Sequence, residues 1–454
     1  MDPSDGLPTP QRYWAILTIG IGLFLAVLDG AIANVALPTI ARDLDTSPAA
    51  TIWVVNAYQL AVTISLLPLA SIGDIFGYRV VYFCGLVVFT IASLFCAMSD
   101  SLVTLTLARI LQGFGAAGLM SVNGALIRAI YPRAWMGRGV GINATVGSIS
   151  SAAGPSVAAA ILAVAHWPWL FAVNVPIGLI AIPIAWRALP RPRRVDRRFD
   201  VAGAGLSALT FGLLISGIDG VAHGAQPSSV AIELVAAVVL GFMLVTRQMA
   251  QTSPLVPVDL MRIPLFALSV FTSVAAFMAQ GMSYVTLPFL FENTLGRSQV
   301  ETGLLLTPWP LTVALIATAT GRLSDRYPVG VLSSIGLAVL ALGLALVALM
   351  PADPSVANIV WRTAICGLGF GFFNTPNNKA ILTSAPLSRS GGASGMQATS
   401  RLFGQTLGAA LVALIFSLAH AHGTVVSLSV AAALAAGAGG ISLMRLGGGR
   451  RKAA

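Results

Sequence analysis

Charged residues are scarce in this sequence. Only 9% of the 454 residues are Asp, Glu, Lys or Arg, whereas 56% are hydrophobic. Soluble domains carry roughly 25% charged residues, so the composition excludes a chain that meets water on all sides. Apolar runs of about 20 residues recur from end to end, and each is long enough to cross a hydrocarbon layer of ~30 Å. The sequence therefore predicts an all-α protein that crosses a membrane many times.

Cysteine is also rare, and its positions do not suit metal or disulfide chemistry. Cys84, Cys96 and Cys366 all lie inside apolar segments, where we expect them to pack. Cys84 and Cys96 are about 18 Å apart along one helix, too far for a bridge. The sequence has no GxxxxGK[ST] loop, so an ATP-driven pump would need a separate ATPase. We expect no cofactor and no metal.

Apolar runs separated by polar breaks predict fourteen membrane spans, so both termini lie on one side. Almost all loop arginines fall on that side, and the opposite loops keep only Arg42 and Arg297. Because positively charged loops stay inside the cell, both termini are predicted to be cytoplasmic. The basic run at 187–198 is interpreted as a topology anchor rather than a nucleic-acid patch. The spans are roughly 13–37, 51–72, 79–98, 102–125, 139–163, 169–187, 201–219, 229–247, 266–290, 302–321, 330–350, 356–379, 396–419 and 424–444.

Short patterns in the first half of the chain recur in the second half, on spans that run in the same direction. The pairs are 35–38 with 285–288, 70–74 with 321–325, and 109–115 with 362–369. This parallel repeat predicts two six-span bundles, at 1–190 and 264–454, joined by a basic linker and two inserted spans at 191–263. Two such bundles are the plan of an alternating-access transporter, with its substrate site near the middle of the membrane.

The stretch ARILQGFGAAG at 108–118 contains the letters of a dinucleotide-binding fingerprint, Gly113-x-Gly115-x-x-Gly118. That fingerprint needs a preceding strand and a helix start in water, and neither exists in the middle of a membrane span. Glycines at this spacing in a membrane helix instead let a neighbouring backbone approach closely. We therefore interpret them as a packing surface.

Arg109, just before these glycines, needs a partner, because a charge inside the membrane is costly. Asp29 is the only carboxylate deep within the first six predicted spans. Counted along their helices, both residues lie ~6 Å to the outer side of the midplane, so they share one level. The pair is either purely structural or a proton site, since burial and a nearby cation act in opposite directions on a carboxyl group. We favour the proton site.

The motifs then resemble those of the fourteen-span drug:proton antiporters of the major facilitator superfamily, the EmrB/QacA-type group, over nearly the whole chain. Single motifs are weak, but their order and spacing together are specific. They are Leu28-Asp29-x-x-x-x-Asn34-Val-Ala-Leu-Pro38, Trp53-Val-Val-Asn-Ala-Tyr58, Gly73-Asp74-x-x-Gly77-x-Arg79, Arg109-x-x-Gln112-Gly113-x-Gly115, Gly154-Pro155 and Trp167-x-Trp169-x-Phe171-x-x-Asn174-Val-Pro-x-Gly178.

The resemblance implies the major facilitator fold and proton-coupled multidrug efflux, with Asp29 and Arg109 as the coupling pair. It also implies gating roles for the cytoplasmic loop motif at 73–79 and for the Gly154-Pro155 motif of the fifth span. The internal repeat adds Asp325, which corresponds to Asp74. These gating residues are Gly73, Asp74, Gly77, Arg79, Gly154, Pro155 and Asp325. Some positions depart from the family pattern and predict a looser latch or a less strict antiport direction: Ala70, Ile75, Tyr78, Ala158, Ala159 and Pro168.

Polar and aromatic residues of the spans are candidates for a substrate cavity, although ordinary packing explains each of them equally well. They are Asn34, Tyr58, Gln59, Gln280, Tyr284, Trp309 and Asn374, with Glu292 at the outer mouth. The later spans hold few carboxylates, Asp219 and Glu233 besides Glu292. Neutral, zwitterionic or anionic substrates therefore stay open beside lipophilic cations.

The alternatives are a proton symporter that imports a nutrient, an exporter of one specific metabolite, a membrane enzyme, and part of an ATP-driven pump. No nucleophile motif and no His/Cys/Asp cluster at a membrane surface supports an enzyme. We expect a multi-pass protein of the bacterial inner membrane that works as a monomer in the lipid bilayer. Its partners are protons and small lipophilic substrates, without nucleic acid. The need for a periplasmic adaptor stays open.

Overall fold

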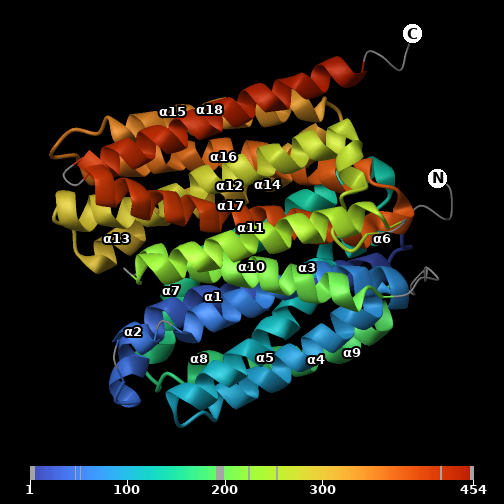
Figure 1. Ribbon diagram of the computed structural model, residues 1–454, viewed down its shortest axis with the longest axis horizontal. Helices are drawn as coiled ribbons and strands as arrows, with labels where there is room; N and C mark the ends of the chain where they lie inside the picture. The colour runs from blue at the N-terminus through green and yellow to red at the C-terminus, as the bar shows by residue number, and fades with distance from the viewer. Residues whose placement is uncertain are drawn as a thin grey trace. The chain divides into compact units, whose positions relative to one another are not determined.

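The computed structural model describes residues 6–46, 48–51, 53–190, 199–222, 225–251, 254–419 and 422–449. Every regular element in these ranges is a helix (Figure 1). The longer helices are α1 (Gln11–Asp43), α3 (Trp53–Phe76), α4 (Tyr78–Ala97), α5 (Leu102–Ser121), α7 (Met136–Leu162), α9 (Asn174–Ala188), α10 (Val201–Ala222), α11 (Pro227–Met249), α12 (Pro264–Phe289), α14 (Pro308–Ser324), α15 (Val329–Ala348), α16 (Val356–Ser384), α17 (Ser390–Ala419) and α18 (Gly423–Gly449).

Short helices complete or precede several of these. They are α2 (Pro48–Thr51), α6 (Asn123–Ile130), α8 (Trp169–Ala172), α13 (Gln299–Leu306) and the π-helical turn η3 (Leu290–Thr294). Two 3₁₀ turns, η1 (Arg133–Trp135) and η4 (Leu387–Arg389), lie directly before α7 and α17, and a third, η2 (Leu260–Arg262), lies one residue before α12.

The described part contains 13 spans that are long and apolar enough to cross a membrane, or 14 with α7. The α7 pair, 133–154 and 156–162, is bent by 46°, so the predicted span at 139–163 is the bent one. Proline has no N–H for the helix ladder, and Pro155 stands at this break. Helices satisfy their own backbone groups, which lipid cannot do. The prediction of an all-helical chain is confirmed.

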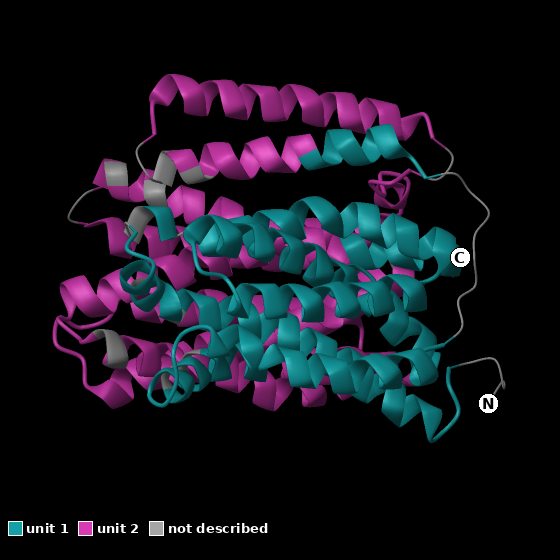
Figure 2. Cartoon of the chain, turned by 90° about the horizontal axis from the view of Figure 1, so that it is seen from below, with its two compact units in different colours: residues 1–133, 149–208, 386–395 teal, residues 134–148, 209–385, 396–454 magenta. Residues whose placement is uncertain are grey.

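The chain divides into two compact units, coloured separately in Figure 2. Unit 1 comprises residues 1–133, 149–208 and 386–395, and unit 2 comprises 134–148, 209–385 and 396–454. Each unit thus includes a short segment that continues into a helix of the other. The predicted bundle boundaries at 190 and 263 stay a prediction.

In unit 1 the glycines of α5 allow both α3 and α4 to pack closely against α5. A Cβ at Gly113 would lie 2.7 Å from the Tyr58 carbonyl oxygen, and one at Gly118 would lie 2.9 Å from the Cα of Gly85. Real Cβ atoms do not approach so closely, so only glycine permits these helix distances. The interpretation of this stretch as a packing surface is confirmed.

Glycines at helix contacts also allow close packing in unit 2. A Cβ at Gly336 of α15 would lie 2.8 Å from the Gly369 carbonyl oxygen of α16, and one at Gly367 would lie 3.0 Å from the Cα of Trp309. Its hydrophobic core joins α12, α15, α16 and α18 through residues such as Leu340 and Phe373. The repeat seen in the sequence therefore recurs in the packing of each unit.

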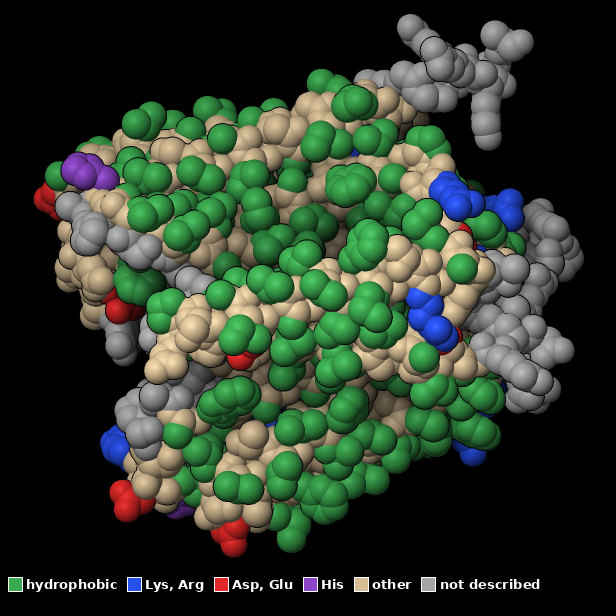
Figure 3. Space-filling view, in the orientation of Figure 1, with side chains coloured by type: hydrophobic (Ala, Val, Ile, Leu, Met, Phe, Trp, Pro, Cys, Tyr) green, Lys and Arg blue, Asp and Glu red, His purple; other side chains and the backbone are tan. Residues whose placement is uncertain are grey.

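Hydrophobic side chains dominate the surface over α10 and α11 in Figure 3. Val235, Val238 and Phe242 of α11 are 63%, 70% and 71% exposed. Such a face suits contact with lipid acyl chains, whereas the buried positions of the units hold many polar side chains.

Candidate functional site

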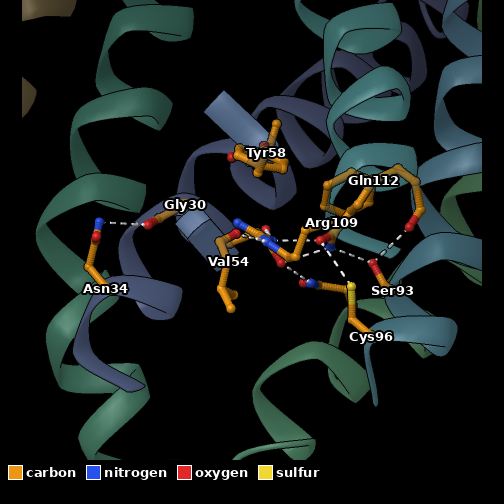
Figure 4. Close-up of polar contacts among 12 residues, drawn as sticks. Gly30, Asn34, Val54, Tyr58, Ser93, Cys96, Arg109 and Gln112 are labelled. Carbon is orange, nitrogen blue, oxygen red and sulfur yellow. Dashed lines mark hydrogen bonds and ion pairs between the residues drawn. The ribbon is translucent and has the colours of Figure 1, made fainter. Parts of the chain in front are cut away.

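Asp29 and Arg109 form an ion pair inside unit 1. Figure 4 shows Arg109 among its neighbours Val54, Tyr58 and Gln112. Asp29 lies on α1 and is 1% exposed, and Arg109 lies on α5 and is fully buried. The Nη1 of Arg109 donates a hydrogen bond to Oδ2 of Asp29. The equal depth expected from the sequence thus brings the two side chains together.

Two amides complete the carboxylate's surroundings. Oδ1 of Asp29 accepts one hydrogen bond from Nε2 of Gln112, at 2.9 Å, and another from Nδ2 of Asn174, at 2.8 Å. Ser93 of α4 orients Gln112, because its Oγ accepts the second Nε2 hydrogen of that amide, at 2.9 Å. All the groups that contact the carboxylate in this network donate to it, so the geometry is that of an ionised Asp29.

The arginine is positioned by α3 as well. Nε of Arg109 donates to the Val54 carbonyl oxygen at 3.0 Å, and its guanidinium carbon lies 4.2 Å from the centre of the Tyr58 ring. Tyr58 is held in turn by a hydrogen bond from its hydroxyl group to the Ala26 carbonyl oxygen, at 3.0 Å. The centre of the Phe171 ring lies 5.4 Å from the same guanidinium carbon. These contacts confine Arg109 to one position.

Sequence reasoning did not assign Gln112, Asn174 or Ser93 to this site. Gln112 and Asn174 stand inside motifs that had been singled out, but an amide carries no charge that demands a partner. Cys96, expected only to pack, donates weakly to Oε1 of Gln112 at 3.5 Å. Tyr58, predicted for the substrate cavity, contacts Arg109, and its cavity role stays a prediction.

A buried pair of this kind can respond to a proton. Removing one partner of a buried ion pair leaves an uncompensated charge and costs about 3–5 kcal/mol. A proton on Asp29 would likewise leave Arg109 without its counter-charge, so the surrounding helices would be favoured in another arrangement. The site therefore has the chemistry to link proton uptake to a conformational change.

Asp74, at the end of α3, contacts the beginning of α17 within unit 1. Its Oδ1 accepts hydrogen bonds from the Gly391 N–H at 2.9 Å and from the Tyr78 hydroxyl at 2.8 Å. The Arg389 guanidinium lies 4.0 Å from Oδ2. The start of a helix carries partial positive charge and free N–H groups, which favour an anion. Asp74 therefore ties the start of α17 to α3.

This contact requires small residues on α17. A Cβ at Gly391 would lie 2.6 Å from the Ala70 carbonyl oxygen, and one at Gly395 would lie 2.7 Å from the Ala70 Cβ. Ala70 and Tyr78, two of the departures from the family pattern, are thus accommodated by glycine on α17 and by a hydrogen bond to Asp74.

Asp325 makes the equivalent contact within unit 2. Its Oδ1 accepts hydrogen bonds from the Gly137 N–H of α7 at 2.8 Å and from Nζ of Lys379 at 2.7 Å. Lys379 also donates to the Ser324 carbonyl oxygen at 2.6 Å. The sequence predicted that Asp74 and Asp325 correspond, and both accept from the first turn of a helix that continues into the other unit.

The remaining predicted gating residues shape the ends of helices. Gly77 has φ of 102°, a conformation that favours glycine, and directly precedes α4. Arg79 contacts Trp186 of α9 through the ring, at 4.6 Å, and through its carbonyl oxygen. Gly73 is buried beside Val122, and Gly154 packs on Ala31 of α1. The side chain of Pro155 lies outside the described residues.

The other cavity candidates do not all come together. In unit 2, Gln280 accepts from Gln405 at 3.1 Å, and the rings of Tyr284 and Trp309 meet edge to face at 5.3 Å. Asn34 donates to Gly30 and Asn374 accepts from Asn378, each within its own helix, whereas Gln59 is exposed and Glu292 is partly exposed. Of the two other carboxylates of the later spans, Glu233 is partly exposed and the side chain of Asp219 lies outside the described residues.

Comparison with known proteins decides the family. The family model of the Major Facilitator Superfamily matches residues 19–409 and, in a second match, 269–446. The chain belongs to the Major Facilitator Superfamily. It is a multi-pass membrane protein and a secondary transporter, and it is not an enzyme.

Relatives of this superfamily chain carry several names. It is 57% identical over 445 residues to the "Uncharacterized transporter YebQ" of Escherichia coli (strain K12), which covers 98% of this chain and 97% of that protein. It is 30% identical to the "Riboflavin transporter RibZ" of Clostridioides difficile (strain 630), over 90% of this chain and 89% of RibZ. It is 31% identical to the "Multidrug resistance protein Stp" of Mycobacterium tuberculosis (strain CDC 1551 / Oshkosh), over 87% of this chain and 74% of Stp.

Solved structures show the same fold for this superfamily chain. The human organic anion transporter MFSD10 superposes with a TM-score of 0.71 at 16% identity, over 96% of this chain and 100% of that one. The proton:xylose symporter XylE superposes with a TM-score of 0.67 at 14% identity, over 95% of each chain. The predicted major facilitator fold is confirmed.

Proposed function

We propose that the protein exports small lipophilic compounds across the bacterial inner membrane in exchange for protons. The observation that carries this proposal is the Asp29 carboxylate, buried beside Arg109 and clamped by Gln112 and Asn174. A proton is the smallest ligand able to neutralise that carboxylate in place. The name of Stp, a multidrug resistance protein, supports efflux as the direction.

In the proposed cycle a proton from the outside binds Asp29 and weakens its hold on Arg109, Gln112 and Asn174. Substrate leaves outward, and release of the proton to the cytoplasm restores the carboxylate network. Each charge that moves down the membrane potential supplies about 2.3 kcal/mol per 100 mV, which corresponds to a gradient of roughly fiftyfold for a neutral solute.

A substrate screen tests the proposal. In everted vesicles that have been acidified by respiration, an added substrate should enter while protons leave, and a pH-sensitive dye inside reports the loss of acidity. Compounds that release protons only in vesicles containing the protein are substrates of an antiporter. If no compound of a broad lipophilic panel does so, the antiport proposal fails.

Proton-coupled uptake of a nutrient is the second candidate, because RibZ is named as a riboflavin transporter and aligns over 90% of this chain. The two candidates differ in the effect of an uncoupler on whole cells. An uncoupler raises the cellular content of an exported compound, whereas it lowers the content of an imported one.

The two aspartates at helix starts are proposed to stabilise one conformational state of the cycle. We expect Asp74→Asn to slow transport roughly tenfold, the equivalent of ~1.4 kcal/mol, because an amide interacts less strongly with the start of α17. Substrate binding should persist, since the residue is remote from the Asp29 network.

Transport and equilibrium binding of the same compound, measured on purified protein in liposomes, check this. Asp325→Asn should give a similar loss, whereas the exposed Asp353→Asn is the matched control and should behave as wild type. Loss of binding together with transport would argue against a gating role.

Glu292 tests the charge of the substrate. It lies in the π-helical turn after α12 and is partly exposed. If the substrates are cations, a carboxylate beside aromatic residues attracts them, and Glu292→Gln should weaken resistance to ethidium, a cation, more than resistance to chloramphenicol, which is neutral. Parallel growth-inhibition curves measure both. Equal shifts for the two compounds would remove this role.

A further inference from the structure

The hydrogen bonds around Asp29 suit its ionised form only. Oδ1 accepts from Gln112 and Asn174, and Oδ2 accepts from Arg109. An ionised carboxylate is a pure acceptor, but a protonated carboxyl group must also donate one hydrogen bond. The protonated state therefore needs an acceptor that the network, as it stands, does not present to Asp29.

Most neighbouring groups cannot supply this acceptor. A guanidinium group has donors only. Oε1 of Gln112 already accepts from Arg109 at 2.6 Å and from Cys96 at 3.5 Å. Oγ of Ser93 accepts from Gln112 and donates to the Phe89 carbonyl oxygen at 2.7 Å.

One acceptor in the network is free. Oδ1 of Asn174 is buried and has no hydrogen-bond partner among the residues that the structure describes. In this cluster the Nη2 of Arg109 is equally unpartnered in the described ranges, but it is a donor and cannot receive the proton of a carboxyl group. Asn174 already contacts Asp29 through the other atom of the same amide.

We propose that Asn174 reverses its amide when Asp29 takes up a proton, and so acts as the positioning residue that senses the state of the coupling site. The inference rests on the proposed proton-coupled function. In this step an O–H bond forms on Asp29 from an incoming proton. The Nδ2–H···Oδ1 hydrogen bond between the two residues breaks, and a hydrogen bond from the new carboxyl O–H to Oδ1 of Asn174 replaces it.

Each of the two amide orientations matches one protonation state of Asp29. In the ionised state Oδ1 of Asn174 is the unpartnered atom, and in the protonated state Nδ2 takes that position. Each orientation leaves one polar atom of the same amide without a protein partner, so the protonation of Asp29 decides between them. Each orientation therefore suits one protonation state of Asp29, and proton uptake shifts the amide from one orientation to the other.

The position of Asn174 connects the switch to the backbone. It is the first residue of α9, separated from α8 only by Val173. Phe171 of α8 lies against the Arg109 guanidinium, and Asn174 of α9 contacts Asp29. The residues on the two sides of the break between α8 and α9 therefore contact both members of the ion pair. The titratable groups facing Asp29 in the described residues are Arg109 from α5 and Cys96 from α4, and Tyr58 from α3 faces Arg109.

Infrared difference spectroscopy on the purified full chain tests the inference without a substrate. The carbonyl stretch of protonated Asp29 is the band that rises as the pH falls in wild type and disappears in Asp29→Asn. In Asn174→Leu this band should move to higher frequency, because the carboxyl O–H loses its acceptor. The midpoint pH at which the band appears should also differ from that of wild type, because the hydrogen bond between the carboxyl group and the amide is lost in both states.

Asn174→Ala is the second variant, for the case that leucine at this position prevents folding, and it should shift the band in the same direction. Asn123→Ala is the matched control, because Asn123 is a buried asparagine of unit 1 outside this network, and it should leave frequency and midpoint unchanged. A monodisperse Asn174→Leu or Asn174→Ala protein with the wild-type band and midpoint would overturn the inference, as would the lack of a titrating Asp29 band in wild type. If the band behaves as expected while vesicles release no protons, the antiport proposal fails and the switch at Asn174 stands.

Discussion

Vesicles containing Asp29→Asn are expected to release no protons when substrate is added. Asparagine has nearly the shape of aspartate and still offers one oxygen to Arg109 and Gln112, so the protein should reach the membrane in normal amount. An amide cannot take up a proton in the relevant pH range, so the cycle loses its driving ion. The measurement is the dye signal in everted vesicles, normalised to the amount of protein.

Two variants make this result specific. Asp29→Glu keeps an acid at the site and should retain part of the activity, because the longer side chain shifts the carboxylate away from the two amides. Asp353→Asn removes an exposed carboxylate and should behave as wild type. Proton release by Asp29→Asn at the wild-type rate would show that coupling occurs elsewhere.

Arg109→Ala is expected to be inactive and markedly less stable. It removes the only cation that contacts Asp29 in the described part of the chain, and breaking a buried pair costs about 3–5 kcal/mol. Arg109→Lys should be partly tolerated: an ammonium group can face Asp29, but it cannot also present the planar fork that reaches Val54 and stacks on Tyr58. Transport in vesicles and the unfolding temperature of purified protein check both variants.

The repeat provides the matched control for this prediction. Arg362 of α16 corresponds to Arg109 in the sequence repeat, but its guanidinium contacts the Leu346 carbonyl oxygen and the Trp361 ring. Arg362→Ala should therefore destabilise unit 2 without changing proton coupling. Full activity of Arg109→Ala would reduce the motif around Arg109 to a packing role.

Much of the site followed from the sequence because of two strong constraints. A charge within the membrane needs a partner at its own depth, so the sequence alone pairs Asp29 with Arg109. The packing role of the glycines at 113 and 118 is also predictable from their place in a membrane span, since small residues let membrane helices approach closely. The correspondence of Asp74 and Asp325 was visible as a repeat, although not what either residue binds.

The roles of the Gln112 and Asn174 amides could not be predicted from the sequence, for a physical reason. Gln112 and Asn174 are neutral, so nothing in their side chains demands a particular partner, and many buried amides satisfy themselves on a nearby backbone. Their role depends on where α5 and α9 place them relative to α1. Likewise, the Gly391 N–H contacts Asp74 across more than 300 positions of the chain, a pairing that local patterns do not encode.

Lipid cannot hydrogen-bond to a backbone, so the lengths of the apolar runs alone determined that this protein is helical and crosses the membrane repeatedly. The costs of buried charge and of crowded helices, likewise readable from residue types, determined the ion pair and the glycine contacts. Only the tertiary structure decided that α7 bends at 154–156. It also decided that residues 134–148 belong to unit 2 and residues 386–395 to unit 1, although the residues that flank each segment belong to the other unit. Finally, it decided that Asn174 donates to Asp29 and keeps one acceptor without a partner in the described residues. Each of these depends on contacts between segments far apart in the chain, whose free energies are set by geometry rather than by composition.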